Sequence, residues 1–163
     1  TKIIDWNFVD TCWRKEPREY QYVAANYLKA MQSYLTENDL PKLERLVVTK
    51  SWWDTVDILD RVVGSLVYDK PELEKIILQW SLSDNIWLRR VAIDHQLLRK
   101  EKTNVQLMEK ILLHNLNQTE FFINKAIGWA LRDYSKTNPD WVACFIEKNK
   151  ERMADLSIKE ASK

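Results

Sequence analysis

The chain has 163 residues, of which 45% are hydrophobic and 30% are charged, and its formal net charge is +1. This balance is typical of a globular domain, and the near-zero charge neither favours nor excludes a nucleic-acid partner. Two glycines and four prolines leave little room for the turns of a β-sandwich or for a glycine-rich phosphate loop. Charged residues interrupt every apolar run, which excludes a membrane-spanning segment of ~20 residues.

Apolar residues recur at helical spacing along almost the whole chain, and no stretch alternates with the period of two that a strand requires. The pattern predicts helices near residues 4–14, 17–34, 39–49, 52–68, 71–81, 84–99, 103–117, 120–136, 139–149 and 155–163.

Local signals mark several of these helix starts. Pro17, Pro71 and Pro139 each suit a first helical position, and Asn138 is a good cap in front of Pro139. The run of residues 51–54, Ser-Trp-Trp-Asp, fits a capping box in which the aspartate reaches back to the cap residue.

Large aromatic residues near the starts of alternate helices indicate a repeat. Tyr20, Trp53, Trp87 and Phe122 are spaced 33, 34 and 35 residues apart. Two helices per interval are typical of a helical solenoid, in which each repeat buries its faces only against its neighbours. The sequence therefore predicts one all-α helical-repeat domain over residues 1–163. Because the sequence begins without methionine and ends within a helical pattern, we expect it to be a fragment of a longer chain.

The same period places four unusual residues on one helix face. Counted from the aromatic residue of each repeat, Asp57 lies at +4, Arg90 at +3 and Trp129 at +7. Positions 0, 3, 4 and 7 share a face. If the second helices of successive pairs are parallel, these three residues and Trp53 converge on one wall of the solenoid. That wall is usually the concave side, where such proteins bind ligands.

Each of these residues also has an ordinary structural explanation. Indoles such as Trp53 and Trp129 most often pack in a core, although eight tryptophans are too many for all to be fully buried. Asp57 suits a solvated surface position. Arg90 suits a surface position at which the alkyl part of the side chain is buried. Yet Asp57 is too far into its helix to cap it. Lys125, at the position of the next repeat that matches Arg90, indicates a basic stripe that could follow phosphates.

Other chemistries find little support in the sequence. His95 and His114 have no cysteine or carboxylate at ligand spacing, so a metal site is not predicted. Cys12 and Cys144 show no CxxC spacing and are interpreted as small core residues in a reducing compartment. The absence of GxSxG and P-loop motifs argues against a conventional hydrolase, kinase or nucleotide-binding enzyme.

Three segments resemble the AlkD-like alkylpurine DNA glycosylases, a family with a HEAT-like helical-repeat solenoid, an α-α superhelix. They are TKSWWDTVD at residues 49–57, SDNIWLRR at 83–90 and EFFINKAIGW at 120–129. The likeness continues to Pro139 and covers the chain from about residue 15 onward. Members of the family usually carry further N-terminal helices that help to cradle DNA, and this sequence begins after them.

The resemblance implies roles for individual residues. Asp57 corresponds to the catalytic carboxylate, and Trp53 and Trp129 correspond to the indoles that face the damaged nucleotide. Arg90 corresponds to the arginine expected to hold a backbone phosphate. Further contacts with DNA are expected from Ser51, Arg89, Lys125 and Arg132.

The implied function is hydrolysis of the N-glycosidic bond of 3-methyladenine or 7-methylguanine in duplex DNA. The resemblance implies a monomer in the bacterial cytoplasm that needs no metal or cofactor and has an open groove. The alternative is a catalytically silent helical-repeat scaffold that binds a DNA structure or a protein partner. The two differ in whether Asp57 and its tryptophan neighbours must be exposed on a concave, basic wall.

Overall fold

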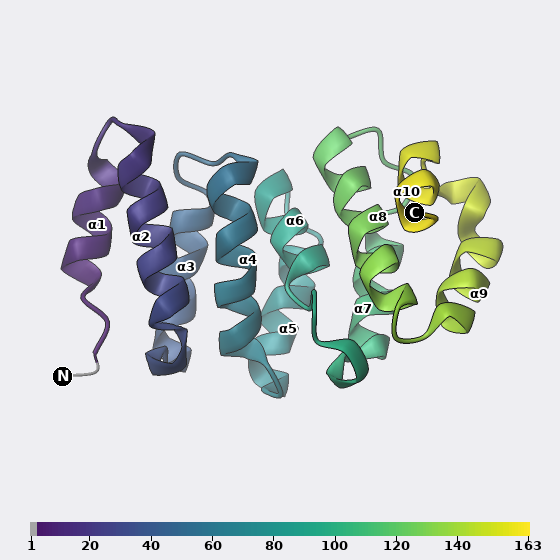
Figure 1. The fold of residues 1–163 in the computed structure, drawn as a ribbon, viewed down its shortest axis with the longest axis horizontal. Coiled ribbons are helices and arrows are strands. Elements are labelled where there is room, and N and C mark those ends of the chain that lie inside the picture. Colours follow the sequence, from purple (N-terminus) through teal and green to yellow (C-terminus); the bar gives the residue numbers. More distant parts are fainter. Residues whose placement is uncertain (1–2) are drawn as a thin grey trace. The chain divides into compact units, whose positions relative to one another are not determined.

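The computed structural model describes residues 3–163, and these residues form α-helices and short 3-10 helices without a strand (Figure 1). The predicted all-α fold is therefore confirmed. The α-helices are α1 (Trp6–Arg14), α2 (Arg18–Ala30), α3 (Leu40–Val47), α4 (Trp53–Val67), α5 (Pro71–Trp80), α6 (Ile86–Asp94), α7 (Val105–His114), α8 (Phe121–Ser135), α9 (Pro139–Asn149) and α10 (Asp155–Ala161). The 3-10 helices are η1 (Gln32–Tyr34), η2 (Glu37–Asp39), η3 (Lys100–Lys102) and η4 (Lys150–Arg152).

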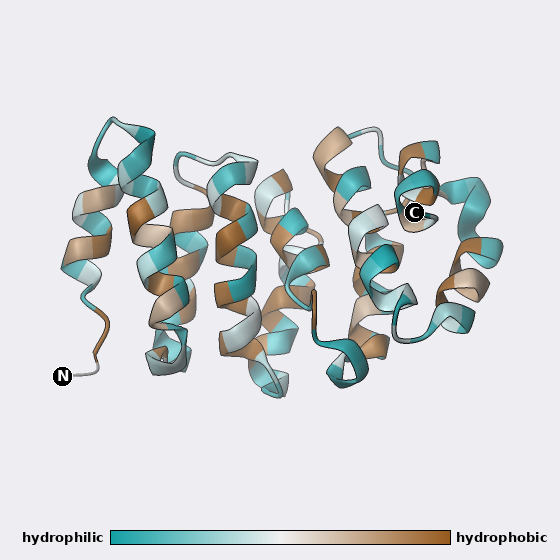
Figure 2. Ribbon diagram, in the orientation of Figure 1, coloured by the Kyte–Doolittle hydropathy of each residue, from teal (hydrophilic) through white to brown (hydrophobic). Residues whose placement is uncertain are grey.

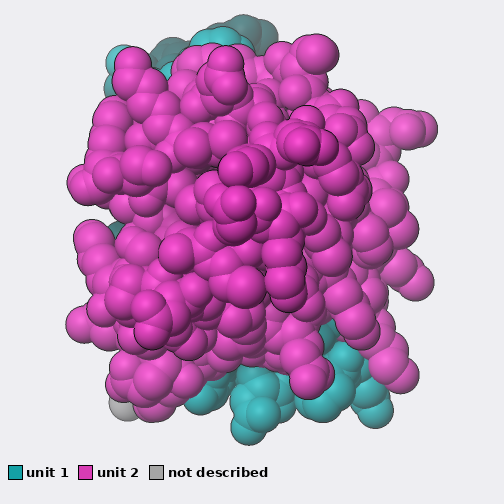
Figure 3. Space-filling model, turned by 90° about the vertical axis from the view of Figure 1, so that its right-hand side faces the viewer, with its two compact units in different colours: residues 1–74 teal, residues 75–163 magenta. Residues whose placement is uncertain are grey.

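The chain divides into two compact units, unit 1 over Thr1–Glu74 and unit 2 over Lys75–Lys163 (Figure 3). Within unit 1, α2 packs against α1 and α4, and α3 packs against α4. Within unit 2, α8 packs against α6, α9 and α10, and α7 packs against α6. Stacked repeats contact mainly their neighbours, so a division of this kind is compatible with one domain. The prediction of a single domain stays a prediction.

Hydrogen bonds from a helix to the next equivalent helix, or to the residues that follow it, join positions about one repeat apart. In unit 1, Trp13 Nε1 donates to the carbonyl oxygen of Thr49 over 2.9 Å, and the two residues are 36 positions apart. In unit 2, Ser157 Oγ donates to the carbonyl oxygen of Asn124 over 2.7 Å, a separation of 33 positions. These spacings are within about one residue of the period of the aromatic residues, as expected where equivalent helices of neighbouring repeats pack side by side.

Each unit has an apolar core between its helices. In α4, the fully buried residues Val56, Leu59 and Val63 recur at helical spacing and face the neighbouring helices. Hydrophobic colour follows such stripes along the ribbons, whereas the connections between helices are mostly hydrophilic (Figure 2). Full burial of a valine or leucine side chain contributes about 1.5–3 kcal/mol, so these stripes supply much of the packing energy.

Most of the predicted helix starts lie where expected. Asn138 accepts the backbone N–H of Trp141 over 3.1 Å, and Pro139 is the first residue of α9. Pro71 is likewise the first residue of α5. Pro17 lies one position earlier than predicted, at the N-cap of α2, where its extended backbone precedes the helix.

The capping box predicted over residues 51–54 is wrong. Trp52, whose backbone is extended, occupies the N-cap position of α4 and makes no side-chain cap hydrogen bond. Ser51 Oγ instead donates to the carbonyl oxygen of Val47 at the end of α3 over 2.5 Å. The Asp54 carboxylate accepts the N–H of Thr55 and side chains of α2. Asp54 therefore both bonds the first turn of α4 and joins that turn to α2.

The helix predicted over residues 84–99 ends early, because α6 stops at Asp94. Leu98 and Lys100 adopt positive φ angles of 70° and 56°, which an α-helix excludes. Tertiary hydrogen bonding stabilises this connection: the N–H of Leu98 donates to Asp133 Oδ2 over 2.9 Å. The apolar periodicity continues past the end of the helix and does not reveal it.

Gly128 lies where α8 and α10 approach closely. A Cβ atom at position 128 would come 2.5 Å from Glu160 Cβ and 3.0 Å from the carbonyl oxygen of Ser157. Alanine in place of a helical glycine usually stabilises by about 1 kcal/mol. Here the clash with Glu160 outweighs that stabilisation. We expect Gly128→Ala to lower the free energy of unfolding by roughly 1–3 kcal/mol in urea titrations. Lys159→Ala, at an exposed position of α10, is the control. A variant more stable than the parent would contradict the close crossing.

Candidate functional site

The first turn of α4 in unit 1 presents two large indoles to solvent. Trp52 is 48% exposed and Trp53 is 50% exposed, so neither is the buried core residue that their size would favour. Asp57 lies one helical turn after Trp53 and is half-buried. An exposed indole beside a partly shielded carboxylate can bind a flat cationic group and stabilise positive charge next to it.

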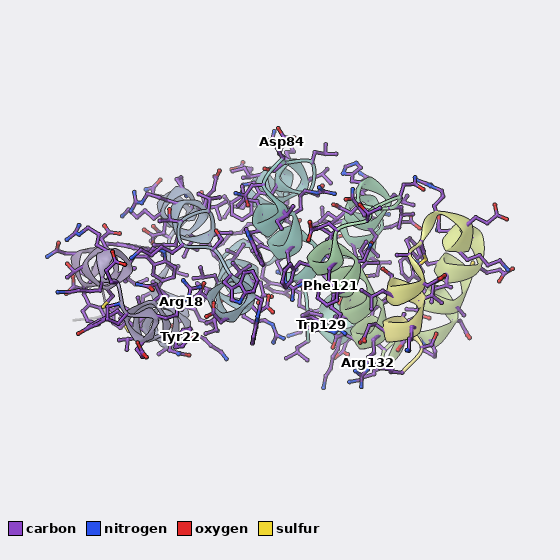
Figure 4. The ribbon with its side chains drawn as sticks, turned by 90° about the horizontal axis from the view of Figure 1, so that it is seen from above. Arg18, Tyr22, Asp84, Phe121, Trp129 and Arg132 are labelled. Carbon is purple, nitrogen blue, oxygen red and sulfur yellow. The ribbon has the colours of Figure 1, made fainter. Side chains whose placement is uncertain are left out.

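Two residues of α2 hold this turn through Asp54. Arg18 donates to both carboxylate oxygens of Asp54, with Nη2 2.5 Å from Oδ1 and Nε 3.0 Å from Oδ2. Tyr22 Oη donates to Oδ2 over 2.6 Å, and Arg18 and Tyr22 lie close together on α2 (Figure 4). The hydrogen bond from Arg18 lowers the pKa of Asp54, and the carboxylate in turn raises the pKa of Tyr22.

Arg18 and Tyr22 were not predicted as site residues. A signal was present in the sequence, because Arg18 and Asp54 are 36 positions apart and so occupy related places in neighbouring repeats. Opposite charges one period apart are the pairs that stacking can bring together.

In unit 2, Arg90 of α6 and Trp129 of α8 form a stacked pair. The guanidinium carbon lies 4.9 Å from the centroid of the Trp129 ring and 5.6 Å from that of Phe122. Arg90 Nη1 also donates to the carbonyl oxygen of Phe122 over 2.6 Å. Arg90 is only 1% exposed, whereas Trp129 is half-buried. Cation–π contacts of this kind contribute about 0.5–2 kcal/mol, so Arg90 orients the indole.

The predicted site residues thus form two pairs. Trp53 and Asp57 share α4 of unit 1, whereas Arg90 and Trp129 meet inside unit 2. The prediction that all four face one groove involves both units and stays a prediction.

Of the four residues expected to contact DNA, Arg132 is exposed near the end of α8, one turn beyond Trp129 (Figure 4). The other three are engaged within the protein. Ser51 Oγ donates to Val47 O, Arg89 Nε donates to Asn115 Oδ1 over 2.8 Å, and Lys125 Nζ donates to Glu160 Oε1 over 2.7 Å. Their roles at DNA stay predictions.

The ion pair of Lys125 with Glu160 joins α8 to α10 and makes stability depend on pH. Hydrogen bonds from Lys125 and then from Lys163 lower the pKa of Glu160 to about 2. A depressed carboxyl pKa contributes stability that is fully present above the unfolded-state value of 4.5 and is lost as the pH falls towards about 2. When the pH is lowered from 4.5 to about 2, we expect the melting temperature of Glu160→Gln to fall less than that of the parent. Identical pH profiles would contradict a stabilising role of this pair.

Other reactive side chains do not form a recognisable centre. Cys12 is buried as predicted, but Cys144 is exposed on α9, so its assignment to the core is wrong. His95 is buried, and burial followed by the charge of Arg99 lowers its pKa to about 3, which keeps the ring neutral at pH 7. Among residues 3–163, no group of three histidine, cysteine, aspartate or glutamate side chains is placed to hold a metal. None of the helices in this described part is long and apolar enough to cross a membrane.

Comparison with known proteins relates the chain to enzymes of DNA alkylation repair. A family model described as DNA alkylation repair enzyme matches residues 2–163. Among solved structures, a predicted DNA alkylation repair enzyme from Enterococcus faecalis is similar, with 36% sequence identity and a TM-score of 0.89. The similarity covers 97% of this chain and 74% of that chain. No curated protein matches the chain.

Proposed function

Because the chain belongs to the DNA alkylation repair enzyme family, we propose that it hydrolyses the N-glycosidic bond of cationic alkylpurines in duplex DNA. The candidate substrates are 3-methyladenine and 7-methylguanine. The observation that carries this proposal is the exposed indole of Trp53 one turn before the carboxylate of Asp57 on α4.

The substrate supplies part of the driving force. An alkylated purine of this class carries a formal positive charge, so the base leaves as a neutral molecule when the C1′–N9 electron pair passes to it. No general acid is needed. The sugar becomes an oxocarbenium ion, and a water oxygen then bonds to C1′ and releases a proton.

Asp57 is proposed to act on the charge that develops on the sugar. A fixed carboxylate near C1′ stabilises the oxocarbenium ion more than the ground state, because the positive charge reaches the sugar only in the transition state. Groups of this kind contribute ~3–4 kcal/mol in comparable sites. The same carboxylate can orient the attacking water and accept its proton.

The aromatic residues are proposed to bind the damaged nucleotide. The π faces of Trp53 and Trp129 attract a cationic base, which contributes ~0.5–2 kcal/mol for each ring. Arg90 is buried against Trp129, so we assign it mainly to the orientation of that indole. Arg132, exposed on α8, is the better candidate for a phosphate contact.

The competing function is a scaffold that binds DNA without cleaving the glycosidic bond. Incubation of the full-length protein with duplex DNA methylated at guanine N7 separates the two. We expect free 7-methylguanine, with strands that break only after alkaline treatment of the abasic product. Binding should weaken as salt rises, with a slope of about −0.9 for each phosphate contacted. Salt-dependent binding without release of free base would favour the scaffold.

A further inference from the structure

We infer that Arg18 is a positioning residue of the candidate site. Together with Tyr22, its guanidinium fixes the first turn of α4 and so holds Trp53 and Asp57 in their working orientation. This inference rests on the proposed function and assigns a residue that lies on a different helix from the proposed chemistry.

The N-cap residue of α4 gives the helix start no side-chain support, and the first turn is bonded through Asp54, whose Oδ1 accepts the N–H of Thr55 over 2.8 Å. Trp52 occupies the N-cap, and its indole makes no cap hydrogen bond to the first turn. A helix end without a cap frays easily, because its first N–H groups have no intrahelical acceptor. The two exposed indoles are attached at this end, so their orientation depends on whatever restrains it.

Arg18 supplies that restraint from α2. Its guanidinium bonds the Asp54 carboxylate in a two-pronged arrangement, and Nη1 donates to the carbonyl oxygen of Lys50 over 2.7 Å. Nη2 also lies 3.2 Å from Thr55 Oγ1. Arg18 therefore bonds both the segment that leads into α4 and the first turn itself. A planar fork of donors resists rotation in a way that the single ammonium group of lysine does not.

The restraint is partly shielded from water. The side chain of Arg18 is 29% exposed and that of Asp54 is 15% exposed. The pKa of Arg18 is raised by its hydrogen bond to Asp54, and Tyr22 Oη donates to the same carboxylate over 2.6 Å. Such a pair holds its geometry better than a solvent-exposed ion pair.

The position of Asp54 connects this network to the candidate site. Asp54 directly follows Trp53 in the chain and lies three residues before Asp57, so all three occupy the first turns of one helix. A displacement of ~1 Å in a catalytic group can lower a rate by roughly 100-fold. Loss of the Arg18 fork should therefore slow the chemistry although Arg18 does not contact the reacting atoms.

The test compares single-turnover excision of 7-methylguanine by Arg18→Met, Arg18→Lys and Tyr22→Phe in the full-length protein. We expect a loss of roughly 10-fold to 100-fold for Arg18→Met, partial recovery in Arg18→Lys and a smaller loss for Tyr22→Phe. The matched control is Arg45→Met, which breaks a surface ion pair with Asp10 in the same unit and should leave the rate unchanged.

A double variant separates positioning from general destabilisation. If Arg18 acts through Asp57, then Arg18→Met should slow the Asp57→Asn protein by much less than it slows the parent. A second readout needs no activity. The fluorine resonance of 5-fluorotryptophan at Trp53, assigned with Trp53→Phe, should broaden or shift in Arg18→Met and not in Arg45→Met.

The outcomes are distinguishable. An Arg18→Met protein that is folded, excises at the parent rate and keeps the Trp53 resonance overturns the inference. Equal fold-losses in the parent and Asp57→Asn backgrounds, with an unchanged Trp53 resonance, also overturn it, because they indicate an effect that passes through neither Asp57 nor Trp53. An Asp57→Asn protein with parental activity overturns the proposed function instead, and the fluorine spectrum then still reports whether Arg18 orders the turn.

Discussion

Asp57→Asn is expected to lower the single-turnover rate of 7-methylguanine excision by at least ~100-fold, with little change in DNA binding. Asparagine keeps the shape of aspartate and removes the charge that opposes the oxocarbenium ion. Because that positive charge reaches the sugar only in the transition state, the substitution affects the rate and not the ground-state complex.

The measurement is release of free base under enzyme excess, with DNA affinity measured by fluorescence anisotropy on the same oligonucleotide. Asp69→Asn is the matched control, because it makes the same exchange at an exposed position just beyond the other end of α4. The φ angle of Asp69 is 56°, in the left-handed region that asparagine adopts readily, so the substitution should not lower stability. An Asp57→Asn protein that excises at the parent rate would leave the scaffold as the better account of this chain.

Trp53→Ala should lower the excision rate less than Asp57→Asn does, since the stacking of an exposed indole on a cationic base contributes only ~0.5–2 kcal/mol. This ordering separates electrostatic stabilisation from substrate binding. A larger loss for the tryptophan variant would assign the dominant role to binding of the damaged base.

Arg90→Met is expected to reduce both excision and stability. Methionine fills much of the space but removes the donor to the carbonyl oxygen of Phe122 and the cation over the Trp129 ring. An unsatisfied buried acceptor costs about 1–3 kcal/mol, and the freed indole should lower the rate by roughly 10-fold.

The salt dependence of binding distinguishes two roles of Arg90. If Arg90 acts through Trp129, the slope of log affinity against log salt stays unchanged in Arg90→Met. A phosphate contact would reduce that slope by about one. Arg152→Met, which removes an exposed arginine at η4 of unit 2, is the control for stability and rate.

The sequence by itself determined the helical fold of this protein and its period. Apolar spacing located most of the helices within a few residues, because burial of one face is a local property of the chain. The recurrence of Tyr20, Trp53, Trp87 and Phe122 predicted the repeat, and hydrogen bonds between helices follow it, since stacking aligns equivalent positions. The sequence segments around Trp53 and Trp129 indicated the family that the comparisons then identified.

Only the tertiary structure decided what the polar side chains contact. The sequence predicts that Asp54 reaches back to Ser51, yet its carboxylate binds Arg18 from 36 positions earlier. Lys125, expected on a basic stripe, binds Glu160 of α10, which lies 35 positions later in the chain. Arg90 is buried against Trp129. A charged side chain takes the best partner in space, and partners one repeat away are brought within reach only when the helices pack. Apolar periodicity records burial along one helix and carries no information about these partners.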